Sequence, residues 1–151
     1  MQVLIVEDNK FNAFCLTRMI EATCYPVHVT VASDSVAAMI QVEKYRPALV
    51  IMDGDLGAHD AGYHNGPALA DMLWQQYPQL AVVAWTDSDR LRLAFAEVFQ
   101  RHNKRFDEYN CWTKIISQTQ LLYTLTCLET GFNVGHYRLQ TTRNNLERLH
   151  A

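Results

Sequence analysis

Short apolar segments recur along the chain, separated by longer segments in which apolar and polar residues are mixed. Three of the short segments are continuous runs rich in valine, isoleucine and leucine, which is typical of strands buried inside a sheet. In another, valine alternates with polar residues, so we expect that strand to be half exposed at an edge of the sheet. The five expected strands cover residues 3–6, 27–31, 48–52, 80–85 and 109–113.

The mixed segments show the three- and four-residue spacing of amphipathic helices. Asn9, Ser33 or Asp34, and Ser88 or Asp89 precede three of them and are suited to cap their amino ends. The apolar stripes expected to face the core comprise Phe11, Phe14, Cys15, Met19 and Ala22 in the first helix; Val36, Met39 and Ile40 in the second; Ala68, Leu69, Met72 and Leu73 in the third; Leu91, Ala94, Phe95, Val98 and Phe99 in the fourth; and Leu121, Leu122, Leu125 and Leu128 in a fifth over residues 115–129.

Strands that alternate with helices in this way favour an α/β fold, with a doubly wound parallel sheet of five strands and helices on both faces. A length of 151 residues suits one domain. We therefore assign residues 1–130 to a single domain and residues 131–151 to a C-terminal extension with weak helical character. The residues of this extension fit a frayed helix, a docking helix or a contact in a homodimer equally well.

Charge and composition limit the classes of protein to which the chain can belong. The formal net charge is −3, so no nucleic-acid partner is indicated. No apolar stretch approaches the roughly 20 residues of a membrane span, and no signal peptide precedes the first strand. We therefore expect a soluble, cytoplasmic protein with no membrane contact. Cys15 and Cys127 lie on apolar helical patterns and are expected to be buried free thiols, since no pair of cysteines has the C-x-x-C spacing.

Acidic, basic and hydroxyl side chains stand where the expected strands end. They are Glu7 and Asp8 after the first strand, Asp53 and Asp55 after the third, Thr86 after the fourth and Lys114 after the fifth. In a doubly wound sheet, functional sites lie at the carboxyl ends of the strands. We therefore expect these side chains to meet at one rim of the sheet.

Carboxylates held close together repel one another unless a cation neutralises them. Mg²⁺ suits such a group, because it prefers oxygen ligands and keeps waters that an incoming phosphate can replace. A central carboxylate such as Asp53 can act as a nucleophile and form an acyl phosphate. The hydroxyl of Thr86 and the ammonium of Lys114 can then bind phosphoryl oxygens that the metal does not reach.

The segments Val3–Asn9, Met52–Leu56, Trp85–Ser88 and Trp112–Lys114 together resemble the four strand-end motifs of response-regulator receiver domains, which act in two-component systems. The resemblance implies a flavodoxin-like fold in which Asp53 is the phosphoacceptor. It implies a phosphodonor that is a phosphohistidine on a sensor histidine kinase or a histidine phosphotransfer protein. It also implies that phosphorylation changes a surface read by a downstream protein target. The chain would then catalyse only its own phosphorylation and dephosphorylation and would not be an enzyme acting on an external substrate.

The resemblance extends over residues 2–130 and implies a role for each strand-end residue. By this resemblance, Asp8 is the direct Mg²⁺ ligand, and Glu7 is its acidic partner, which acts through water. The backbone carbonyl of Asp55 completes the metal site. Thr86 supplies the switch hydroxyl, and Lys114 is the cation that pairs with the phosphoryl group. The resemblance thus implies a Mg²⁺ site formed by Glu7, Asp8, Asp53 and Asp55.

The chain departs from the family's pattern at three positions near the expected site. Asp87 stands where a small residue is usual, Cys111 replaces the aromatic switch residue, and Ile115 replaces the proline after the lysine. A second acid beside the phosphoryl group would crowd its approach, unless Asp87 points to solvent or caps the next helix. These departures support an alternative hypothesis, in which the chain is a pseudo-receiver that binds a partner constitutively and without phosphorylation.

The segment 57–66 is longer than the family's pattern allows. Gly57 stands where a proline is usual, and Gly66, the glycine that opens the third helix, comes about five residues late. A polar loop explains His59 and His64 better than a transition-metal site does. An aspartate-nucleophile phosphatase is a third hypothesis, although its D-x-D motif follows the first strand of the core and the one here follows the third.

Overall fold

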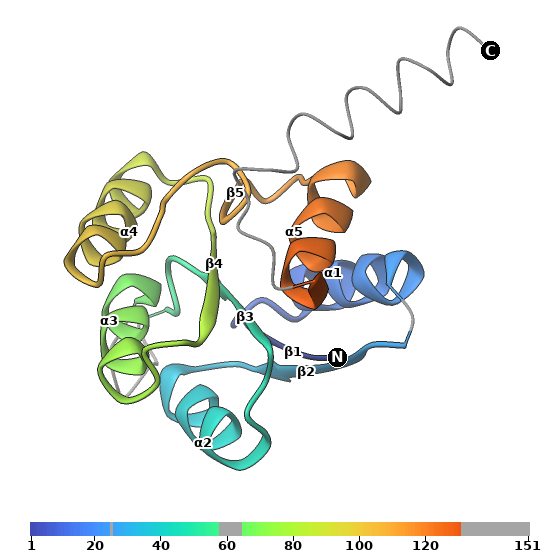
Figure 1. Ribbon diagram of the computed structural model, residues 1–151, viewed down its shortest axis with the longest axis horizontal. Coiled ribbons are helices and arrows are strands. Elements are labelled where there is room, and N and C mark those ends of the chain that lie inside the picture. The colour runs from blue at the N-terminus through green and yellow to red at the C-terminus, as the bar shows by residue number, and fades with distance from the viewer. Residues whose placement is uncertain (25, 58–64, 131–151) are drawn as a thin grey trace, which may run out of the picture.

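Five parallel strands form a single sheet in the computed structural model of the chain, which describes residues 1–24, 26–57 and 65–130 (Figure 1). The strands are β1 (Gln2–Val6), β2 (His28–Ala32), β3 (Leu49–Asp53), β4 (Ala81–Trp85) and β5 (Cys111–Trp112). They lie in the order β2-β1-β3-β4-β5, and every neighbouring pair is parallel. The predicted α/β fold is confirmed, as is the placement of the partly exposed strand, β2, at an edge of the sheet.

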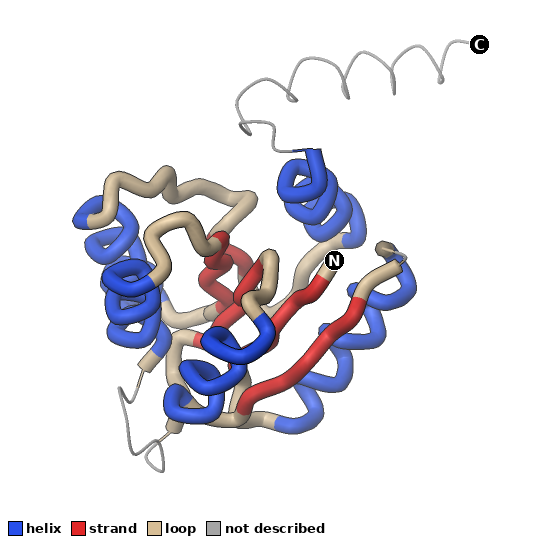
Figure 2. Tube along the Cα trace, turned by 60° about the horizontal axis from the view of Figure 1, so that its bottom comes forward, coloured by secondary structure: helices blue, strands red, loops and turns tan. Residues whose placement is uncertain are grey.

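Helices cover both faces of the sheet, which Figure 2 shows as one layer between them. The helices are α1 (Lys10–Thr23), α2 (Ser35–Tyr45), α3 (Gly66–Gln76), α4 (Asp89–Arg101) and α5 (Gln118–Thr130). One core lies between the sheet and α1 and α5, and a second lies between the sheet and α2, α3 and α4 (Figure 1). The loops that follow β1 and β3 leave toward opposite faces, which opens a crevice at the carboxyl ends of these two neighbouring strands.

The helix starts follow the predicted caps. The side-chain oxygen of Asn9 accepts hydrogen bonds from the backbone N–H groups of Phe11 and Asn12, both at 3.0 Å. Asp34 and Ser88 are the caps of α2 and α4, which settles the two pairs of candidates. Each cap satisfies backbone donors that the first helical turn leaves free, so these side chains set where each helix begins.

Two of the predicted helix faces are wrong. In α1, Phe11 and Phe14 are 72% and 62% exposed, and the buried residues are Ala13, Leu16 and Ile20. In α2, Val36 and Ile40 are exposed, and the buried residues are Ser35, Ala38 and Val42. Both helices carry apolar residues on two sides, and each turns toward the core the side that begins with a small residue, which lets helix and sheet approach closely. The predicted stripe of α4 is confirmed, with Leu91, Phe95, Val98 and Phe99 buried.

Single positions elsewhere also differ from the predictions. Cys15 is an exposed thiol, because it lies on the outer side of α1, whereas Cys127 is buried as predicted. Leu122 in α5 is 50% exposed, since Leu121 and Leu125 already fill the contact with the sheet. Within the described residues, no helix is long and apolar enough to cross a membrane.

The last strand and the last helix are shorter than predicted. The strand β5 has only two residues because a hydrogen-bonded turn, in which the backbone N–H of Cys111 donates to the carbonyl of Asp107, takes up the residues before it. The helix α5 begins at Gln118 and not at residue 115, because the hydroxyl of Thr113 donates to the carbonyl of Ile115 and holds a loop there. The predicted extension 131–151 lies outside the described residues.

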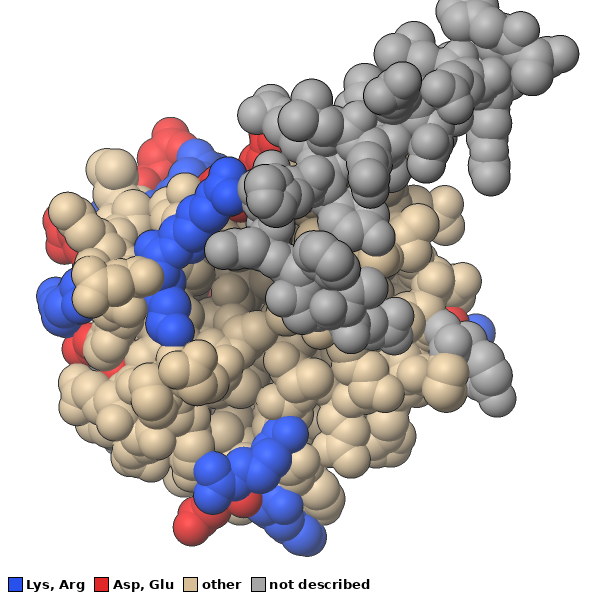
Figure 3. All heavy atoms as spheres, viewed as in Figure 1, with Lys and Arg blue, Asp and Glu red and all other residues tan. Residues whose placement is uncertain are grey.

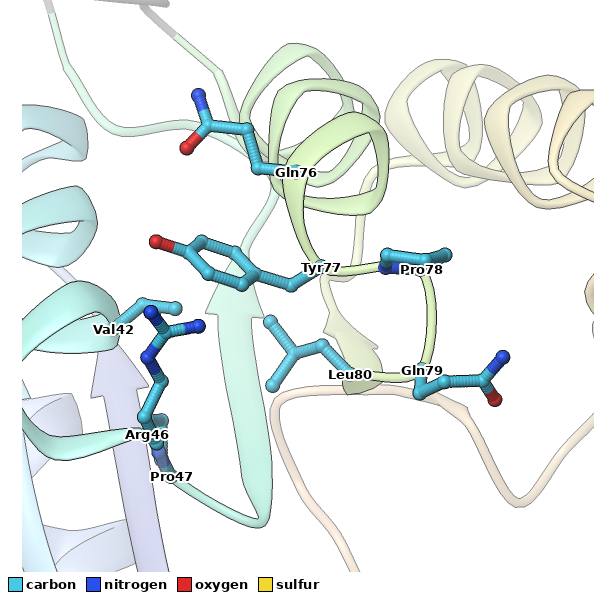
Figure 4. Close-up of a pocket in the computed structure, with 8 residues that line it drawn as sticks. All are labelled: Val42, Arg46, Pro47, Gln76, Tyr77, Pro78, Gln79 and Leu80. Carbon is cyan, nitrogen blue, oxygen red and sulfur yellow. The ribbon is translucent and has the colours of Figure 1, made fainter.

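Two hollows lie at the amino ends of the strands, opposite the crevice. One, of about 350 Å³, is formed where α2 and α3 end, and there the guanidinium of Arg46 packs over the ring of Tyr77 at 4.5 Å (Figure 4). The other, of about 280 Å³, extends from Trp74 to Cys127. The face in Figure 3 is mostly uncharged, with Lys and Arg side chains in small groups near its edge. Both hollows are separate from the strand-end acids.

Candidate functional site

The crevice brings together three of the predicted acids. Glu7 and Asp8 follow β1, and Asp53 ends β3, the strand that pairs with β1 in parallel register. Oxygen atoms of the three carboxylates all lie within 4.8 Å of one another. Glu7 and Asp53 are buried, and Asp8 is exposed. The group is therefore a partly buried concentration of negative charge that is open to solvent on the side of Asp8.

The donor set of this acid group fits Mg²⁺. All three residues offer carboxylate oxygens, which are the hard ligands that Mg²⁺ prefers. Octahedral ligands at about 2.1 Å from a metal lie at most roughly 4.2 Å apart, so the group needs only small side-chain adjustments to hold the ion. Asp8 is the residue best placed to face an ion with bound water, because it is exposed, whereas Glu7 and Asp53 are buried and also contact Lys114.

Lys114 supplies the cation that faces these acids. Its ammonium nitrogen lies 2.5 Å from an oxygen of Glu7 and 3.0 Å from an oxygen of Asp53. The same nitrogen lies 3.8 Å from the centre of the Trp85 ring, a distance typical of a cation–π contact. Trp85 is buried at the end of β4. The ammonium is therefore held between two carboxylates and an aromatic face.

Burial raises the pKa of the Glu7 carboxyl above its ordinary value of 4.5. The nearby Asp53 charge acts in the same direction, whereas the hydrogen bonds from Lys114 and from the backbone N–H of Asn9 lower the pKa. The pKa of Glu7 is raised overall, because the effect of its removal from water is larger than the effect of its hydrogen-bond partners. Glu7 thus holds its proton to a higher pH in the folded protein than an exposed glutamate does.

Thr86 lies directly beyond β4, close to the residue after Asp53. Its hydroxyl oxygen accepts a hydrogen bond from the backbone N–H of Ser88 at 3.1 Å, and a Cβ atom built on Gly54 would lie 3.0 Å from that oxygen. Because Asp53 pairs with Trp85 across the sheet, the hydroxyl stands one position further along the same rim. Thr86 is buried, so its hydroxyl has few positions available other than facing this rim or the start of α4.

Two glycines let the backbone approach the acids. Gly57 has a φ of +80°, and a Cβ atom there would lie 2.8 Å from an oxygen of Asp8. A proline cannot adopt this φ, which explains why the residue usual in the family is replaced. Gly66 opens α3, and a Cβ atom there would lie 2.2 Å from the carbonyl oxygen of Asp53. Gly66 thus packs against Asp53, although it comes about five residues later than the family's pattern places it.

The carboxylate of Asp55 does not join the acid group. Its side chain is exposed and accepts a hydrogen bond from the backbone N–H of Gly57 at 2.9 Å. Its backbone forms an isolated bridge with Asn65, which caps α3. The bridge joins the two ends of the inserted loop. Residues 58–64 of this loop, including His59 and His64, lie outside the described residues. The expected role of Asp55, through its backbone carbonyl, stays a prediction.

Asp87 is exposed, as the first of its two predicted alternatives requires, and it does not cap α4. Its carboxylate accepts a hydrogen bond from the backbone N–H of Lys114 at 2.8 Å, and Ser88 is the cap. The sequence motifs do not predict this contact, nor the packing of Trp85 under Lys114 or of Gly57 against Asp8. Asp87 and Gly57 were visible in the sequence as unusual residues, but their contacts are made between loops and have no local pattern.

Solved structures similar to this chain are receiver domains. A signal receiver domain of an HD domain-containing protein from Pseudomonas fluorescens Pf-5 matches with a TM-score of 0.71 at 20% identity, over 86% of this chain and 94% of that one. The receiver domain of NtrX from Brucella abortus matches with a TM-score of 0.65 at 21% identity, over 83% and 96%. At these identities the likeness shows the fold alone.

A longer protein, the RcsB response regulator of Salmonella typhimurium, matches with a TM-score of 0.68 at 20% identity, over 88% of this chain but only 62% of that one. The chain therefore spans less than two thirds of RcsB. The RcsB structure is described in terms of DNA interaction, which is a statement about that protein. A comparison with curated proteins found no match.

A family model gives the assignment that structural likeness alone does not. The model of the response regulator receiver domain matches residues 3–110, which is most of the chain. This range contains the acid group and Thr86, and Lys114, which lies beyond it, is connected to the acid group by its two ion pairs. The chain therefore belongs to the response regulator receiver domain family, which is consistent with a part in two-component signalling.

Proposed function

We propose that the chain accepts a phosphoryl group on Asp53 from a phosphohistidine of a sensor histidine kinase or a histidine phosphotransfer protein, and then signals through a downstream protein target. The observation that carries this proposal is the position of the Lys114 ammonium, 2.5 Å from Glu7 and 3.0 Å from Asp53, within a group of three carboxylates. A nucleophilic carboxylate beside a cation can meet an anionic donor without prohibitive repulsion.

In the proposed transfer, a carboxylate oxygen of Asp53 forms a bond to phosphorus, the bond between phosphorus and the donor imidazole breaks, and the imidazole nitrogen takes up a proton. Lys114 and the hydroxyl of Thr86 bind oxygens of the transferred group. Bound Mg²⁺, held by Asp8 and Asp53 with Glu7 beside it and the carbonyl of Asp55 completing the site, would neutralise charge on the phosphoryl oxygens. Attack by water on phosphorus later releases phosphate, so the chain acts only on its own phosphorylation state.

A protein donor is favoured by the apolar surface beside the acids. Phe11, 72% exposed, and Phe14, 62% exposed, lie in the first two turns of α1, which begins two residues after Asp8. Ile115, next to Lys114, is 91% exposed. Exposed apolar side chains bordered by polar residues are typical of protein contacts. The proposal places the chain in the cytoplasm, where histidine kinases use ATP, and includes no nucleic-acid or membrane partner.

The test is beryllofluoride, which imitates the phosphoryl group, added after titration with Mg²⁺. Trp85 packs against Lys114, so its fluorescence should change when the ammonium moves toward the new ligand. We expect a saturable change that requires Mg²⁺, disappears in Asp53→Asn and persists in Asp55→Asn. Asp55→Asn is the matched control, because its side chain lies outside the acid group and an amide oxygen can still accept from Gly57. A response that survives in Asp53→Asn contradicts the proposal.

One observation favours a second function, a pseudo-receiver that binds its partner without phosphorylation. The Lys114 ammonium pairs with both Glu7 and Asp53, so these residues can serve as a structural ion-pair group. This function predicts no binding of Mg²⁺ or beryllofluoride and an unchanged affinity for the partner in Asp53→Asn. Turnover of a small phosphomonoester would instead indicate a phosphatase.

A further inference from the structure

Asp87 connects the two loops that carry Thr86 and Lys114. It follows Thr86 directly, and its carboxylate accepts the backbone N–H of Lys114 at 2.8 Å. The side chain is therefore neither a member of the acid group nor an obstacle turned toward Asp53. It makes a hydrogen bond between a side chain of one loop and the main chain of the other.

The position of this bond follows from the sheet. The ladder between β4 and β5 pairs Ala84 with Cys111 and Trp85 with Trp112, and its last backbone bond runs from the N–H of Thr86 to the carbonyl of Trp112 at 2.9 Å. Continued by two positions, the same register places Asp87 opposite Lys114. The carboxylate thus extends the pairing by one hydrogen bond, beyond the point where the backbone ladder ends.

The loop after β5 has few other attachments. The strand itself has only two residues and lies at the edge of the sheet. Beyond it, the hydroxyl of Thr113 donates to the carbonyl of Ile115 within the same loop, and the Ile115 side chain is 91% exposed. Within the described part of the chain, the backbone N–H of Lys114 donates to Asp87, which lies in the loop after the neighbouring strand β4.

We propose that Asp87 is a positioning residue, which fixes the main chain of Lys114 so that its ammonium stays between Glu7 and Asp53. A lysine side chain has four rotatable bonds, so its ammonium can be held only if the main chain from which it extends is fixed. Asp87 anchors one end of the residue, and Glu7, Asp53 and Trp85 contact the other.

The first measurement is the amide signal of Lys114 in ¹⁵N-labelled protein without metal. Asp87→Ala removes the acceptor, Asp87→Asn keeps an acceptor oxygen, and Asp89→Ala is the matched control, because it removes an exposed acid two residues later that pairs with Arg92. We expect a downfield, slowly exchanging amide in the wild type, in Asp87→Asn and in Asp89→Ala. In Asp87→Ala we expect the amide to move upfield and exchange faster, with the melting temperature nearly unchanged.

The second measurement compares two affinities in the same variants. Asp87→Ala should weaken beryllofluoride binding by roughly three- to tenfold, as expected for loss of one hydrogen bond, and leave Mg²⁺ affinity within about twofold. Asp87→Asn should restore wild-type affinity. An unchanged amide or an unchanged beryllofluoride affinity in Asp87→Ala overturns the positioning role, as does an Asp87→Asn variant that behaves like Asp87→Ala. If the wild type does not bind beryllofluoride, the proposed function fails, and the amide signal still decides whether Asp87 holds Lys114.

Discussion

The ammonium of Lys114 lies closer to Glu7, at 2.5 Å, than to Asp53, at 3.0 Å, so one lysine joins the ends of two neighbouring parallel strands. The contact offsets the cost of burying two carboxylates, since removing an unpaired charge from water costs several kcal/mol. It also means that the lysine and a metal ion compete for the same oxygens. Lys114 therefore has opposite effects on the two expected ligands, since it repels Mg²⁺ and attracts a phosphoryl group.

Replacement of Lys114 should separate these two effects. In Lys114→Met, Mg²⁺ affinity should rise by at least roughly fivefold, since two unit charges 4 Å apart in water repel by about 1 kcal/mol. Beryllofluoride affinity measured at saturating Mg²⁺ should fall. Isothermal titration calorimetry measures both. Lys104→Met is the control, because Lys104 lies beside the hollow at the opposite end of the strands. Weaker Mg²⁺ binding in Lys114→Met would contradict a competition between Lys114 and the metal ion.

The raised pKa of Glu7 predicts the pH dependence of the metal-free protein. Because the folded state holds this proton to a higher pH than the unfolded chain, the stability that the group contributes is present below pH 4.5 and is lost as pH rises through the folded pKa. The free energy of unfolding of the wild type, relative to that of Glu7→Gln, should therefore fall from pH 4.5 to neutrality in EDTA.

Urea unfolding at a series of pH values, with both proteins side by side, checks this prediction. Glu7→Gln is the matched reference, because it has nearly the same shape and cannot titrate, and its carbonyl oxygen can still accept from Asn9. Saturating Mg²⁺ should reduce the fall in the wild type, since the ion favours the charged carboxylate. A difference that stays constant or grows with pH would show that the pKa is not raised.

The fold and most of the acid group follow from local signals in the sequence. The buried strand β3 is a continuous apolar run, the caps Asn9 and Ser88 are suited to hydrogen-bond the first helical turn, and parallel strands bring their end residues to one rim. The contacts of Asp87 and Gly57 could not be predicted in this way. Each depends on the spatial distance between two loops, and neither changes the hydrophobic pattern from which the elements are recognised.

The predictions of the buried helix faces were wrong for a different reason. In α1, the two phenylalanines define an apolar stripe as strong as that of Ala13, Leu16 and Ile20, and periodicity alone does not say which stripe packs on the sheet. The choice depends on how closely the helix approaches the strands. Pattern reasoning therefore chose the wrong side of α1, and the exposure of the two phenylalanines supports the proposed contact with a protein donor.

Gly57 should be intolerant of any side chain. In Gly57→Ala, the φ of +80° costs about 1–2 kcal/mol for a residue with a Cβ atom, and that atom would lie 2.8 Å from an oxygen of Asp8. We expect lower stability by at least this amount and Mg²⁺ affinity lower by roughly tenfold or more, as when a ligand is displaced. Thermal unfolding and Mg²⁺ titration measure the two effects.

A double-mutant cycle separates strain from contact at this position. In an Asp8→Ala background the neighbouring oxygen is gone, so Gly57→Ala should cost only the backbone term. The loss of stability should then be smaller than in the wild-type background. Equal losses in the two backgrounds would mean that the Cβ atom does not press on Asp8, and that Gly57 is required for its φ alone.

The apolar surface of α1 should matter for a protein donor and not for a small one. Replacement of Phe11 and Phe14 by serine should lower kcat/KM for transfer from a purified histidine kinase by roughly tenfold or more, because exposed aromatics at the centre of a contact contribute most of its affinity. The rate with acetyl phosphate should stay within about twofold, since that donor reaches Asp53 without contacting α1. The matched control replaces Leu93 and Leu122, which are 69% and 50% exposed on α4 and α5. An equal fall in rate with both donors would mean that the substitutions disturb the acid group. An unchanged rate with both donors would mean that the kinase binds another surface.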